Sequence, residues 1–294
     1  MNGNNMTSLS MYVRVHPCFD EKAHFIYARI HLPVAPKCNI QCNYCERIVD
    51  ENFCVDRPGV AAKLISPSEA VKLVKRAKDL YPSLSIVGIA GPGEPLANPE
   101  TFETLEKVHE EFPDLIKCVA TNGLLLPRYV HKLWKLGVRT LTVTVNSIKP
   151  EIGQKIYSWI KYNGKTYFGF EAAKRLINAQ LKGIEEAVKT GFAVKVNTVL
   201  IPEINDTHVV EIAREVARRG VYIQNIIPLI PLGFFKNRRP PTCEELETLR
   251  EKCSKYIRQF HLCKMCRADA LGVPGQEKSI YEKNWCSRSC HGRC

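Results

Sequence analysis

The sequence lacks an apolar run of membrane length, a hydrophobic centre near its first residues and a regular cysteine framework. Without about 20 consecutive apolar residues, we expect no membrane-spanning helix. Residues 1–11 are polar, so we expect no signal peptide. Lysines and arginines are scattered along predicted helices rather than clustered with aromatic residues. We therefore expect no nucleic-acid partner despite the net charge of +12, whereas a docking face for an acidic protein stays open.

Cysteine, in contrast, is abundant, with 13 in 294 residues. A chain of this length can bury one large core, and the irregular spacing does not fit the disulfide scaffold of a small secreted domain. Thirteen cysteines also exceed what packing in a cytosolic enzyme needs. We expect metal chemistry in a reducing, anaerobic cytoplasm, where the basic excess would offset part of the negative charge of cluster-bound thiolates.

Short apolar runs alternate with amphipathic segments from Ala28 onward, a pattern typical of repeated βα units around a parallel sheet. Strands are predicted at residues 29–35, 84–90, 115–121, 140–145, 193–200 and 222–229. Helices are predicted at residues 67–80, 99–111, 127–135, 170–190 and 207–219, the first opening with a Ser66–Glu69 capping box. The sequence therefore predicts an α/β fold, a partial (βα)6 TIM-like barrel with active-site residues at the carboxyl ends of its strands.

The pattern divides the chain into three regions. Residues 1–27 form an N-terminal arm, residues 28–231 the partial barrel, and residues 232–294 a cysteine-rich C-terminal extension. Within the extension, residues 243–259 predict a polar helix, and residues 262–294 show no strand pattern. This tail has too few apolar residues for a core of its own, so we expect it to fold over the barrel mouth.

A cysteine triad with the spacing CxxxCxxC follows the first predicted strand. Cys38, Cys42 and Cys45 supply three thiolates, one fewer than a [4Fe-4S] cluster has irons, so a cluster held here keeps one iron open for another ligand. The alternative is a zinc knuckle or three unrelated buried thiols, but a structural zinc site needs four ligands. We therefore interpret the triad as a catalytic iron–sulfur centre.

The second predicted strand leads into the glycine-rich segment GPGEP at residues 91–95, where the backbone can approach a ligand closely. With Tyr44 directly before the last triad cysteine, these features resemble the radical S-adenosylmethionine (SAM) superfamily. There the open iron chelates SAM, and electron transfer cleaves it to a 5′-deoxyadenosyl radical. The resemblance implies that Gly91, Gly93 and Glu94 bind the SAM amino group, although the segment alone would indicate a plain turn.

Polar residues at further strand ends extend this pocket. The resemblance implies that Asn146 and Asn197 contact the SAM ribose or carboxylate, and that Tyr44 and Pro228 flank the adenine. The alternative for the asparagines is an ordinary role in turns.

Four further segments narrow the resemblance: VHPCF at 15–19, RPGV at 57–60, YSW at 157–159 and CKMCRADALG at 263–272. With the triad they closely resemble the NifB family of radical SAM enzymes, which acts in nitrogenase cofactor assembly. The resemblance implies three [4Fe-4S] clusters, one that binds SAM and two auxiliary clusters that are substrates. The family fuses these two, with a SAM-derived carbon and one sulfur, into an eight-iron carbide cluster. Implied partners are a cofactor assembly scaffold, an iron–sulfur donor and an electron donor.

The alternation of side chains along a strand indicates which residues can face the barrel interior and bind the auxiliary clusters. The apolar alternation of the first strand sends His31 into the barrel, and Cys118 on the third strand can also point inward. Cys18, just ahead of the first strand, can cover the end of the barrel. We assign one cluster to Cys18, His31 and Cys118, with His24 as the rival nitrogen ligand. The alternative for a lone histidine is a satisfied core residue.

The second auxiliary cluster is assigned to Cys263 and Cys266 with Cys54, although a CxxC pair also fits zinc or redox chemistry. The family usually has Cys-x-x-Glu before Arg-Pro-Gly, whereas here Asp56 is the only nearby carboxylate, which leaves the alignment of Cys54 and any acidic role of Asp56 open. Five cysteines have no assigned ligand role: Cys243, Cys253, Cys286, Cys290 and Cys294.

The favoured function is thus a radical SAM carbide synthase, and two alternatives stay open. A radical SAM maturase that modifies peptides and carries auxiliary clusters in a C-terminal extension would suit the cysteine-rich tail. It would not suit the ligands before the triad and inside the barrel, and it would require a peptide substrate. A non-catalytic iron–sulfur scaffold or electron carrier needs no SAM pocket, so SAM binding would count against it.

Overall fold

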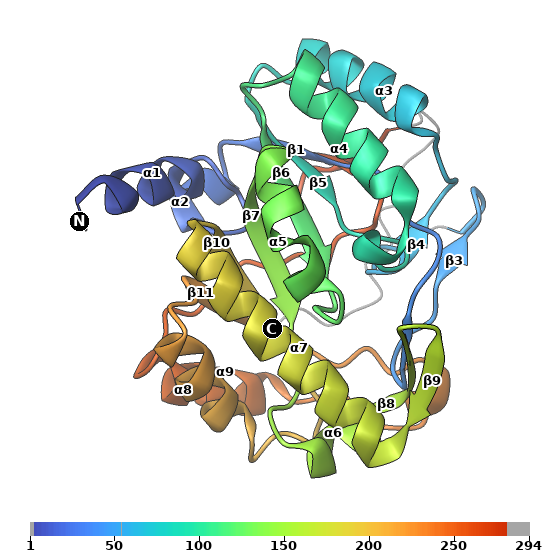
Figure 1. Ribbon diagram of the computed structural model, residues 1–294, viewed down its shortest axis with the longest axis vertical. Helices are drawn as coiled ribbons and strands as arrows, with labels where there is room; N and C mark the ends of the chain where they lie inside the picture. Colours follow the sequence, from blue (N-terminus) through green and yellow to red (C-terminus); the bar gives the residue numbers. More distant parts are fainter. Residues whose placement is uncertain (1–2, 54, 281–294) are drawn as a thin grey trace.

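The computed structural model describes residues 3–53 and 55–280. Its main sheet has eight strands in the order β11-β10-β7-β6-β5-β1-β12-β13, and the six from β1 to β11 pair in parallel, in chain order. These six are β1 Ala28–His31, β5 Leu84–Ile89, β6 Ile116–Thr121, β7 Val138–Thr144, β10 Ala193–Leu200 and β11 Ile223–Pro228. The curled sheet (Figure 1) confirms the predicted partial barrel.

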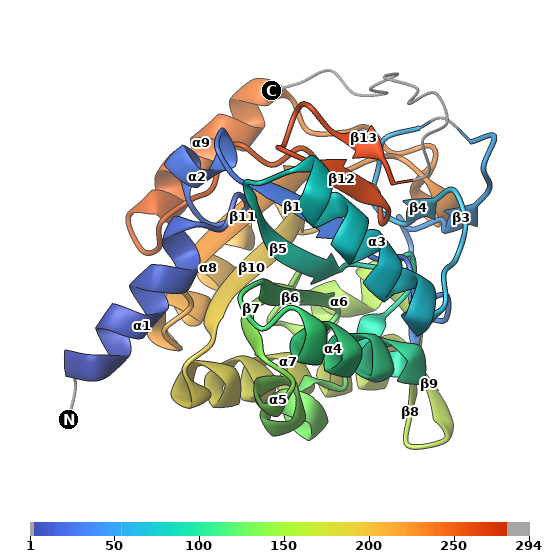
Figure 2. The ribbon, with the colours of Figure 1, turned by 90° about the horizontal axis from the view of Figure 1, so that it is seen from above.

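Helices cover the outer face of this sheet (Figure 2). They are α3 Pro67–Leu80, α4 Pro99–Glu111, α5 Leu126–Lys135, α7 Gly169–Thr190 and α8 Val209–Arg218, with α6 Pro150–Ile156 and the 3-10 turn η1 Pro95–Ala97 in the connections. The predicted capping box at the start of α3 is confirmed. Ser66 Oγ accepts from the Glu69 N–H at 3.2 Å, and a Glu69 carboxylate oxygen accepts from the Ser66 N–H at 2.8 Å.

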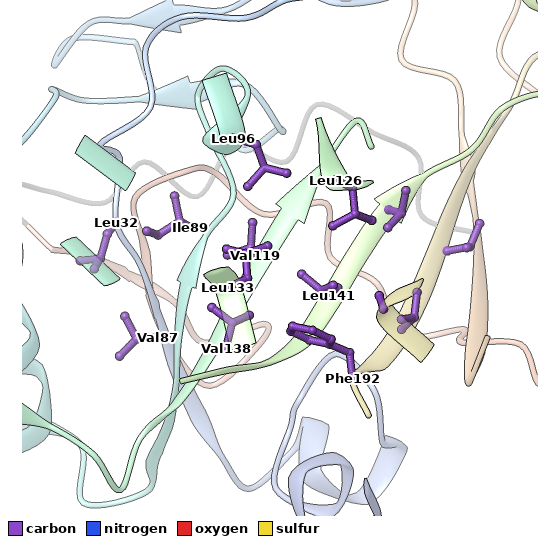
Figure 3. Close-up of a cluster of buried hydrophobic side chains, with 14 of the residues drawn as sticks. Leu32, Val87, Ile89, Leu96, Val119, Leu126, Leu133, Val138, Leu141 and Phe192 are labelled. Carbon is purple, nitrogen blue, oxygen red and sulfur yellow. The ribbon is translucent and has the colours of Figure 1, made fainter. Parts of the chain in front are cut away.

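The main hydrophobic core lies between the sheet and the helix layer (Figure 3). It includes Leu32, Val87, Ile89, Leu96, Val119, Leu126, Leu133, Val138, Leu141 and Phe192. Because side chains alternate along a strand, residues of the opposite parity face the barrel interior. These include Arg29, His31, Cys118, Thr142 and Lys195. A complete barrel usually fills its interior with branched apolar side chains, so this polar lining marks a space built for something else.

The N-terminal arm covers the amino-terminal end of the barrel (Figure 2). It contains two helices that the sequence pattern did not predict, α1 Gly3–Arg14 and α2 Glu21–His24. Val13 and Phe19 pack with Phe260 and with Ala193 and Ile223, the first residues of β10 and β11. The segment that carries Cys18 is therefore held against the end of the barrel.

The C-terminal extension joins the main sheet, and the expectation of no strand in residues 262–294 was wrong for part of it. After η2 Gly233–Phe235 and α9 Cys243–Ser254, which ends earlier than predicted, the chain forms β12 Ala270–Gly272 and β13 Lys278–Ser279. β12 pairs antiparallel with β1, with Arg29 opposite Gly272. Strands of three and two residues are too short to show a period of two, and their place depends on contacts with distant β1.

Two small sheets, also unpredicted, brace the loops at the carboxyl ends of the barrel strands. One consists of β2 Ile40–Cys42, β8 Tyr157–Tyr162 and β9 Lys165–Phe168, and the other of β3 Ile48–Val49 and β4 Val60–Ala61. None of the helices within residues 3–53 and 55–280 has the length and apolar character needed to cross a bilayer.

Candidate functional site

The cysteine triad lies in the loop that runs from β1 into the small sheet around β2. Cys42 ends β2, and its carbonyl accepts from the Cys45 N–H at 3.1 Å. Asn43 fastens the loop on two sides. Its N–H donates to the Ile156 carbonyl at 2.8 Å, and its carbonyl accepts from the Phe235 N–H at 3.1 Å. The loop is thus anchored to segments more than 100 residues away along the chain.

The three triad thiols are free and half-buried. Burial is the main cause that raises the pKa of each, that of Cys38 to about 11, and the charges of Cys45 and Cys38 further raise the pKa of Cys42. This mutual effect shows that the thiols share one neighbourhood. The Arg47 guanidinium, 3.9 Å from Cys45 Sγ, favours the thiolate. Because a cluster binds thiolates, loading the triad must release protons.

A [4Fe-4S] cluster fits this set better than a single metal ion. Within residues 3–53 and 55–280, no three His, Cys, Asp or Glu side chains are grouped so that they could hold one ion. A cluster instead takes one thiolate per iron, so its cysteines stand further apart. Three free thiols around one half-buried space, with Arg47 to offset charge, meet that requirement.

The glycine-rich segment is joined to the triad loop through the backbone. The Gly93 N–H donates to the Ala35 carbonyl at 2.6 Å, and the Glu94 N–H donates to the Lys37 carbonyl at 2.8 Å. A Cβ on Gly93 would lie 2.3 Å from the Lys37 carbonyl oxygen, so only glycine fits. Gly91 has φ +138°, which also favours glycine. The segment therefore lies directly against the residue that precedes the triad.

Glu94, only 3% exposed, stands at the carboxyl ends of β5 and β6. Its Oε1 accepts from Thr121 Oγ1 at 2.5 Å and from the Leu96 N–H at 3.1 Å, and its Oε2 accepts from the Asn122 N–H at 2.7 Å. Burial raises the pKa of Glu94 to about 7, against these hydrogen bonds. The Glu94 charge in turn raises the pKa of Cys38. The structure thus brings Glu94 and the triad into one site.

Asn146, two residues after the end of β7, links the triad loop to the barrel. Its Nδ2 donates to Tyr44 Oη at 2.7 Å, and its Oδ1 accepts from the Val199 N–H of β10 at 2.8 Å. Asn146 is fully buried, and burial raises the pKa of Tyr44 well above its usual range. The structure therefore places Asn146 where it positions Tyr44. Direct contact of either residue with SAM stays a prediction.

Asn197 and Pro228 lie on the neighbouring strands β10 and β11. Asn197 Oδ1 accepts from Asn225 Nδ2 at 3.1 Å, and Pro228 ends β11 opposite Leu200. Asn225, which sequence reasoning missed, has a buried Oδ1 with no hydrogen-bond partner in the part of the chain that the structure describes. Its position in register with Asn197 was the available signal. Roles of these residues toward SAM also stay predictions.

A second group of thiols lines the barrel interior toward its amino-terminal end. The charge of Cys18 raises the pKa of both Cys118 and Cys266, and Cys263 acts on Cys266 as well. Burial is the largest cause in both cases and raises the pKa of Cys118 to about 11. Cys18 and Cys263 pack against the same hydrophobic cluster. One cysteine of each assigned set, Cys18 and Cys263, therefore lies beside the same part of the core.

His31 lies on the inner face of β1, as its parity predicted. A Cβ on Gly88 would lie 2.9 Å from the His31 Cδ2 atom, so the ring covers this glycine of β5. His31 Nδ1 lies 3.0 Å from the Arg267 carbonyl, which can only accept, so Nδ1 carries the proton and Nε2 has a free lone pair. Burial, and after it the charge of Arg29, lowers the pKa of His31 to about 4. The ring is therefore neutral at pH 7, the form that binds metal.

His24, the rival nitrogen ligand, has the same tautomer. Its Nδ1 donates to the Pro17 carbonyl at 2.8 Å, and its Nε2 is buried without a hydrogen-bond partner among the described residues. The ring lies edge-on to Phe25 and Phe260, at centroid distances of 5.1 and 5.9 Å. Both histidines thus offer a lone pair, but His31 stands on the strand that faces the thiols.

Arg29 is a functional candidate that sequence reasoning missed. It is 1% exposed, and its Nη2 lies 2.7 Å from both Glu277 Oε1 and Cys266 Sγ, while its Nη1 donates to the Gly272 carbonyl at 2.7 Å. Burial alone would lower the pKa of Arg29. The negative charges nearby, chiefly those of Cys266 and Glu277, more than offset burial, so the pKa of Arg29 is raised. Arg29 and His31 are two residues apart on one strand, so their side chains face the same side. The predicted inward direction of His31 was therefore the signal that Arg29 also faces the barrel interior.

Four assigned or unassigned cysteines lie outside the described residues: Cys54, Cys286, Cys290 and Cys294. The carbonyls of Phe53 and Val55 accept from Arg267 Nη1 at 2.8 and 3.4 Å, and Arg267 also pairs with Asp269 at 2.8 Å. Arg267, in the segment of residues 266–269, therefore holds the chain on both sides of position 54. Burial raises the pKa of half-buried Asp56, whereas Arg267 opposes that rise.

The chain matches the family model of the Radical SAM superfamily over residues 32–216. It is 50% identical over 282 residues to the FeMo cofactor biosynthesis protein NifB of Methanocaldococcus jannaschii, covering 96% of this chain and 94% of the relative. The protein of the same description from Methanocaldococcus infernus is 50% identical over 277 residues, covering 94% and 91%. That of Bradyrhizobium diazoefficiens is 46% identical over 276 residues, and the match spans 55% of its length.

Solved structures show the same architecture. SuiB from Streptococcus suis aligns with a TM-score of 0.60 at 13% identity, covering 81% of this chain and 51% of SuiB. A radical SAM methyltransferase from Sphaerobacter thermophilus aligns with a TM-score of 0.52 at 20% identity, covering 80% and 64%. At these identities the likeness shows the fold alone.

Proposed function

The chain belongs to the NifB family of the radical SAM superfamily, enzymes of FeMo cofactor biosynthesis, and we propose that it is a carbide synthase. It joins two substrate [4Fe-4S] clusters, one carbon from a SAM methyl group and one sulfur into the eight-iron precursor of the nitrogenase cofactor. One SAM donates the methyl group and a second supplies the radical. Superfamily membership implies the SAM-binding cluster and SAM itself, and the two auxiliary clusters are part of the proposal.

One observation supports the proposal most directly, the second set of free thiols inside the barrel. Cys18 acts electrostatically on both Cys118 and Cys266, and His31 offers its lone pair from the same inner face. The triad alone suffices to bind the SAM-cleaving cluster, so further free thiols inside the barrel are available as ligands for other clusters. Metal ligands that line the interior suit substrates that are themselves iron–sulfur clusters.

Cys38, Cys42 and Cys45 would hold the resident cluster, which, when bound, supplies the electron that cleaves SAM. The backbone at Gly91 and Gly93 would receive the SAM amino group. Glu94 holds that backbone through the hydrogen bonds around its carboxylate. In the same proposal, the SAM ribose or carboxylate meets Asn146 and Asn197, and the adenine lies between Tyr44 and Pro228.

The two substrate clusters would be held deeper in the barrel. One takes Cys18, Cys118 and His31, with His24 as the rival, and the other takes Cys263 and Cys266 with Cys54. Buried Arg29, already 2.7 Å from Cys266 Sγ, would offset the negative charge that thiolates bring to this interior. An iron–sulfur donor and an electron donor would supply the enzyme, and an assembly scaffold would accept the product, in an anaerobic cytoplasm.

The test is anaerobic reconstitution of the full chain, followed by iron counting, 5′-deoxyadenosine analysis and tracing of methyl-labelled SAM into the product cluster. Replacing the three triad cysteines by alanine should abolish 5′-deoxyadenosine while the auxiliary clusters still load. Replacing Cys263 and Cys266 should remove about four irons per chain, one cluster equivalent, and block label incorporation while SAM cleavage persists.

The matched control is Cys253→Ala, a free cysteine buried on α9 that has no place in the proposed sites. It should retain iron, SAM cleavage and label incorporation. A product cluster that forms without Cys263 and Cys266, or without label from SAM, would contradict the proposal. Label that appears only in an added peptide would instead favour the maturase alternative, to which the 50% identical relatives lend no support.

A further inference from the structure

His16 is buried beside Cys18 and has no role in the function proposed above. Its side chain is 2% exposed, and its ring packs against Phe19 at a centroid distance of 4.4 Å. The backbone N–H of Cys18 donates to His16 Nδ1 at 3.1 Å. Because a backbone N–H can only donate, His16 Nδ1 carries no proton.

The tautomer of His16 follows from its surroundings. The Cys18 N–H occupies His16 Nδ1, so the ring cannot carry a second proton and is neutral. A neutral imidazole with a bare Nδ1 carries its proton on Nε2. This Nε2 is buried and has no hydrogen-bond partner in the part of the chain that the structure describes. His16 therefore presents an unused donor.

His31 and His24 have the opposite tautomer. In both, Nδ1 faces a carbonyl oxygen, at 3.0 and 2.8 Å, which leaves a lone pair on Nε2. Those two rings are suited to bind iron. His16, with a proton on Nε2, is suited to donate a hydrogen bond to an anionic acceptor.

The other groups near Cys18 also favour an anionic acceptor. Lys195 is 5% exposed, and its Nζ donates to the Cys18 carbonyl at 3.2 Å. The same ammonium lies over the rings of Phe19 and Phe260, at 5.2 and 5.5 Å from their centroids. Two buried donors, one of them cationic, thus flank the cysteine that we assign to a substrate cluster. The sulfurs of a [4Fe-4S] cluster are acceptors of this kind.

We propose that His16 Nε2–H donates a hydrogen bond to a sulfur of the cluster bound through Cys18, and thereby sets the reduction potential of that cluster. This inference rests on the proposed assignment of Cys18 as a ligand. A hydrogen bond to a cluster sulfur stabilises the reduced state, which carries more negative charge, and raises the potential. His16 is thus a positioning residue, not a ligand.

Two substitutions separate the donor from the structural contact. His16→Asn places an amide oxygen near the position of Nδ1, so it can still accept from the Cys18 N–H, but it loses the donor at Nε2. His16→Gln places an amide nitrogen near the position of Nε2, so it keeps a donor and loses the acceptor. His131→Asn, at an exposed position of α5, is the matched control.

The readout is an EPR-monitored redox titration of the reconstituted full chain in which the triad, Cys263 and Cys266 are alanine, so that the Cys18 cluster supplies the signal. His16→Asn should lower the ratio of reduced to oxidised cluster about tenfold at a fixed potential, a shift of about 59 mV for one electron. His16→Gln and His131→Asn should stay near the parent value.

Three results would overturn the inference. An unchanged potential in His16→Asn would show that no donor acts on the cluster. Equal shifts in both His16 variants, or loss of the cluster from both, would assign the effect to the Cys18 backbone contact. Cys18→Ala distinguishes a failure of the underlying assignment. If Cys18→Ala retains the cluster, Cys18 is not a ligand, and both the Cys18 assignment and the His16 inference fail. If Cys18→Ala loses the cluster while His16→Asn keeps the parent potential, only the His16 inference fails.

Discussion

Replacing Gly93 with alanine should separate the glycine-rich segment from the cysteine triad. The new Cβ would lie 2.3 Å from the Lys37 carbonyl oxygen, 2.7 Å from the Lys37 carbonyl carbon and 2.8 Å from the Pro36 carbonyl oxygen. These are backbone atoms, so no side-chain rotation relieves the contact. The two hydrogen bonds that join the segments, from Gly93 to Ala35 and from Glu94 to Lys37, hold the backbone in place. The segment must therefore move away from the triad loop.

The cost can be bounded from these contacts. Overpacking in a well-packed region costs roughly 1–3 kcal/mol, and each of the two hydrogen bonds contributes about 1 kcal/mol. We expect Gly93→Ala to lose about 3–5 kcal/mol of unfolding free energy, measured by urea unfolding of the metal-free chain. Displacement of the segment should also weaken SAM binding by the reconstituted enzyme at least tenfold, about 1.4 kcal/mol, while the iron bound by the triad stays.

The matched control is Gly164→Ala, in the turn between β8 and β9. No atom lies within 4 Å of a Cβ there, and its φ of +75° imposes only the strain of a left-handed residue, about 1–2 kcal/mol. Its SAM affinity should equal that of the parent. SAM affinity within twofold of the parent in Gly93→Ala would refute the claim that the close approach of the two segments builds the SAM site.

Three further predictions concern buried polar groups. Because burial raises the pKa of Glu94 from about 4.5 to about 7, the native chain binds this proton more tightly than the unfolded chain. Stability of the metal-free protein should therefore fall, by up to about 3 kcal/mol, as pH rises through this window, and a urea series on Glu94→Gln should lack that slope. Arg29→Met should cost about 3 kcal/mol in urea unfolding because it leaves the partly buried Glu277 carboxylate without its cation and the Gly272 carbonyl without its donor. The exposed-pair control Lys78→Met should cost less than about 1 kcal/mol, and equal losses in the two variants would contradict this prediction. Tyr44→Phe should cost about 1–3 kcal/mol, since Asn146 Nδ2 loses its acceptor; an unchanged urea midpoint would show that this bond does not hold the triad loop.

Local rules predicted the barrel units well. The predicted bounds of β10 at 193–200 and of α3 at 67–80 match the structure, because each element carries its own signals, alternation in the strand and a capping box at the helix start. Parity also placed His31 on the inner face of β1. These features depend on residues within a few positions of one another, so they can be derived from sequence.

The contacts that complete the interior could not be derived in this way. Arg29 binds the Gly272 carbonyl and Glu277, which lie 243 and 248 residues away along the chain. A buried arginine in a predicted strand conflicts with local pattern rules, and only the antiparallel strand β12 supplies its partners. Strand β12 in turn is too short to be predicted without β1. The burial of Arg29 can be explained only once β12 is placed, and β12 can be recognised only once its pairing with β1 is known.

The same limit explains how the metal ligands were grouped. Strand parity and position assigned Cys18 and Cys118 to one cluster, and the family-like CxxC motif assigned Cys263 and Cys266 to another. In the structure, Cys18 and Cys263 pack against the same hydrophobic cluster. Under the proposed function, two substrate clusters would have to approach each other before fusion, and ligands on separate surfaces would keep them apart. Cys266 beside buried Arg29, with the arm and the extension packed at the same end of the barrel, is therefore the arrangement that the proposed cluster fusion would require.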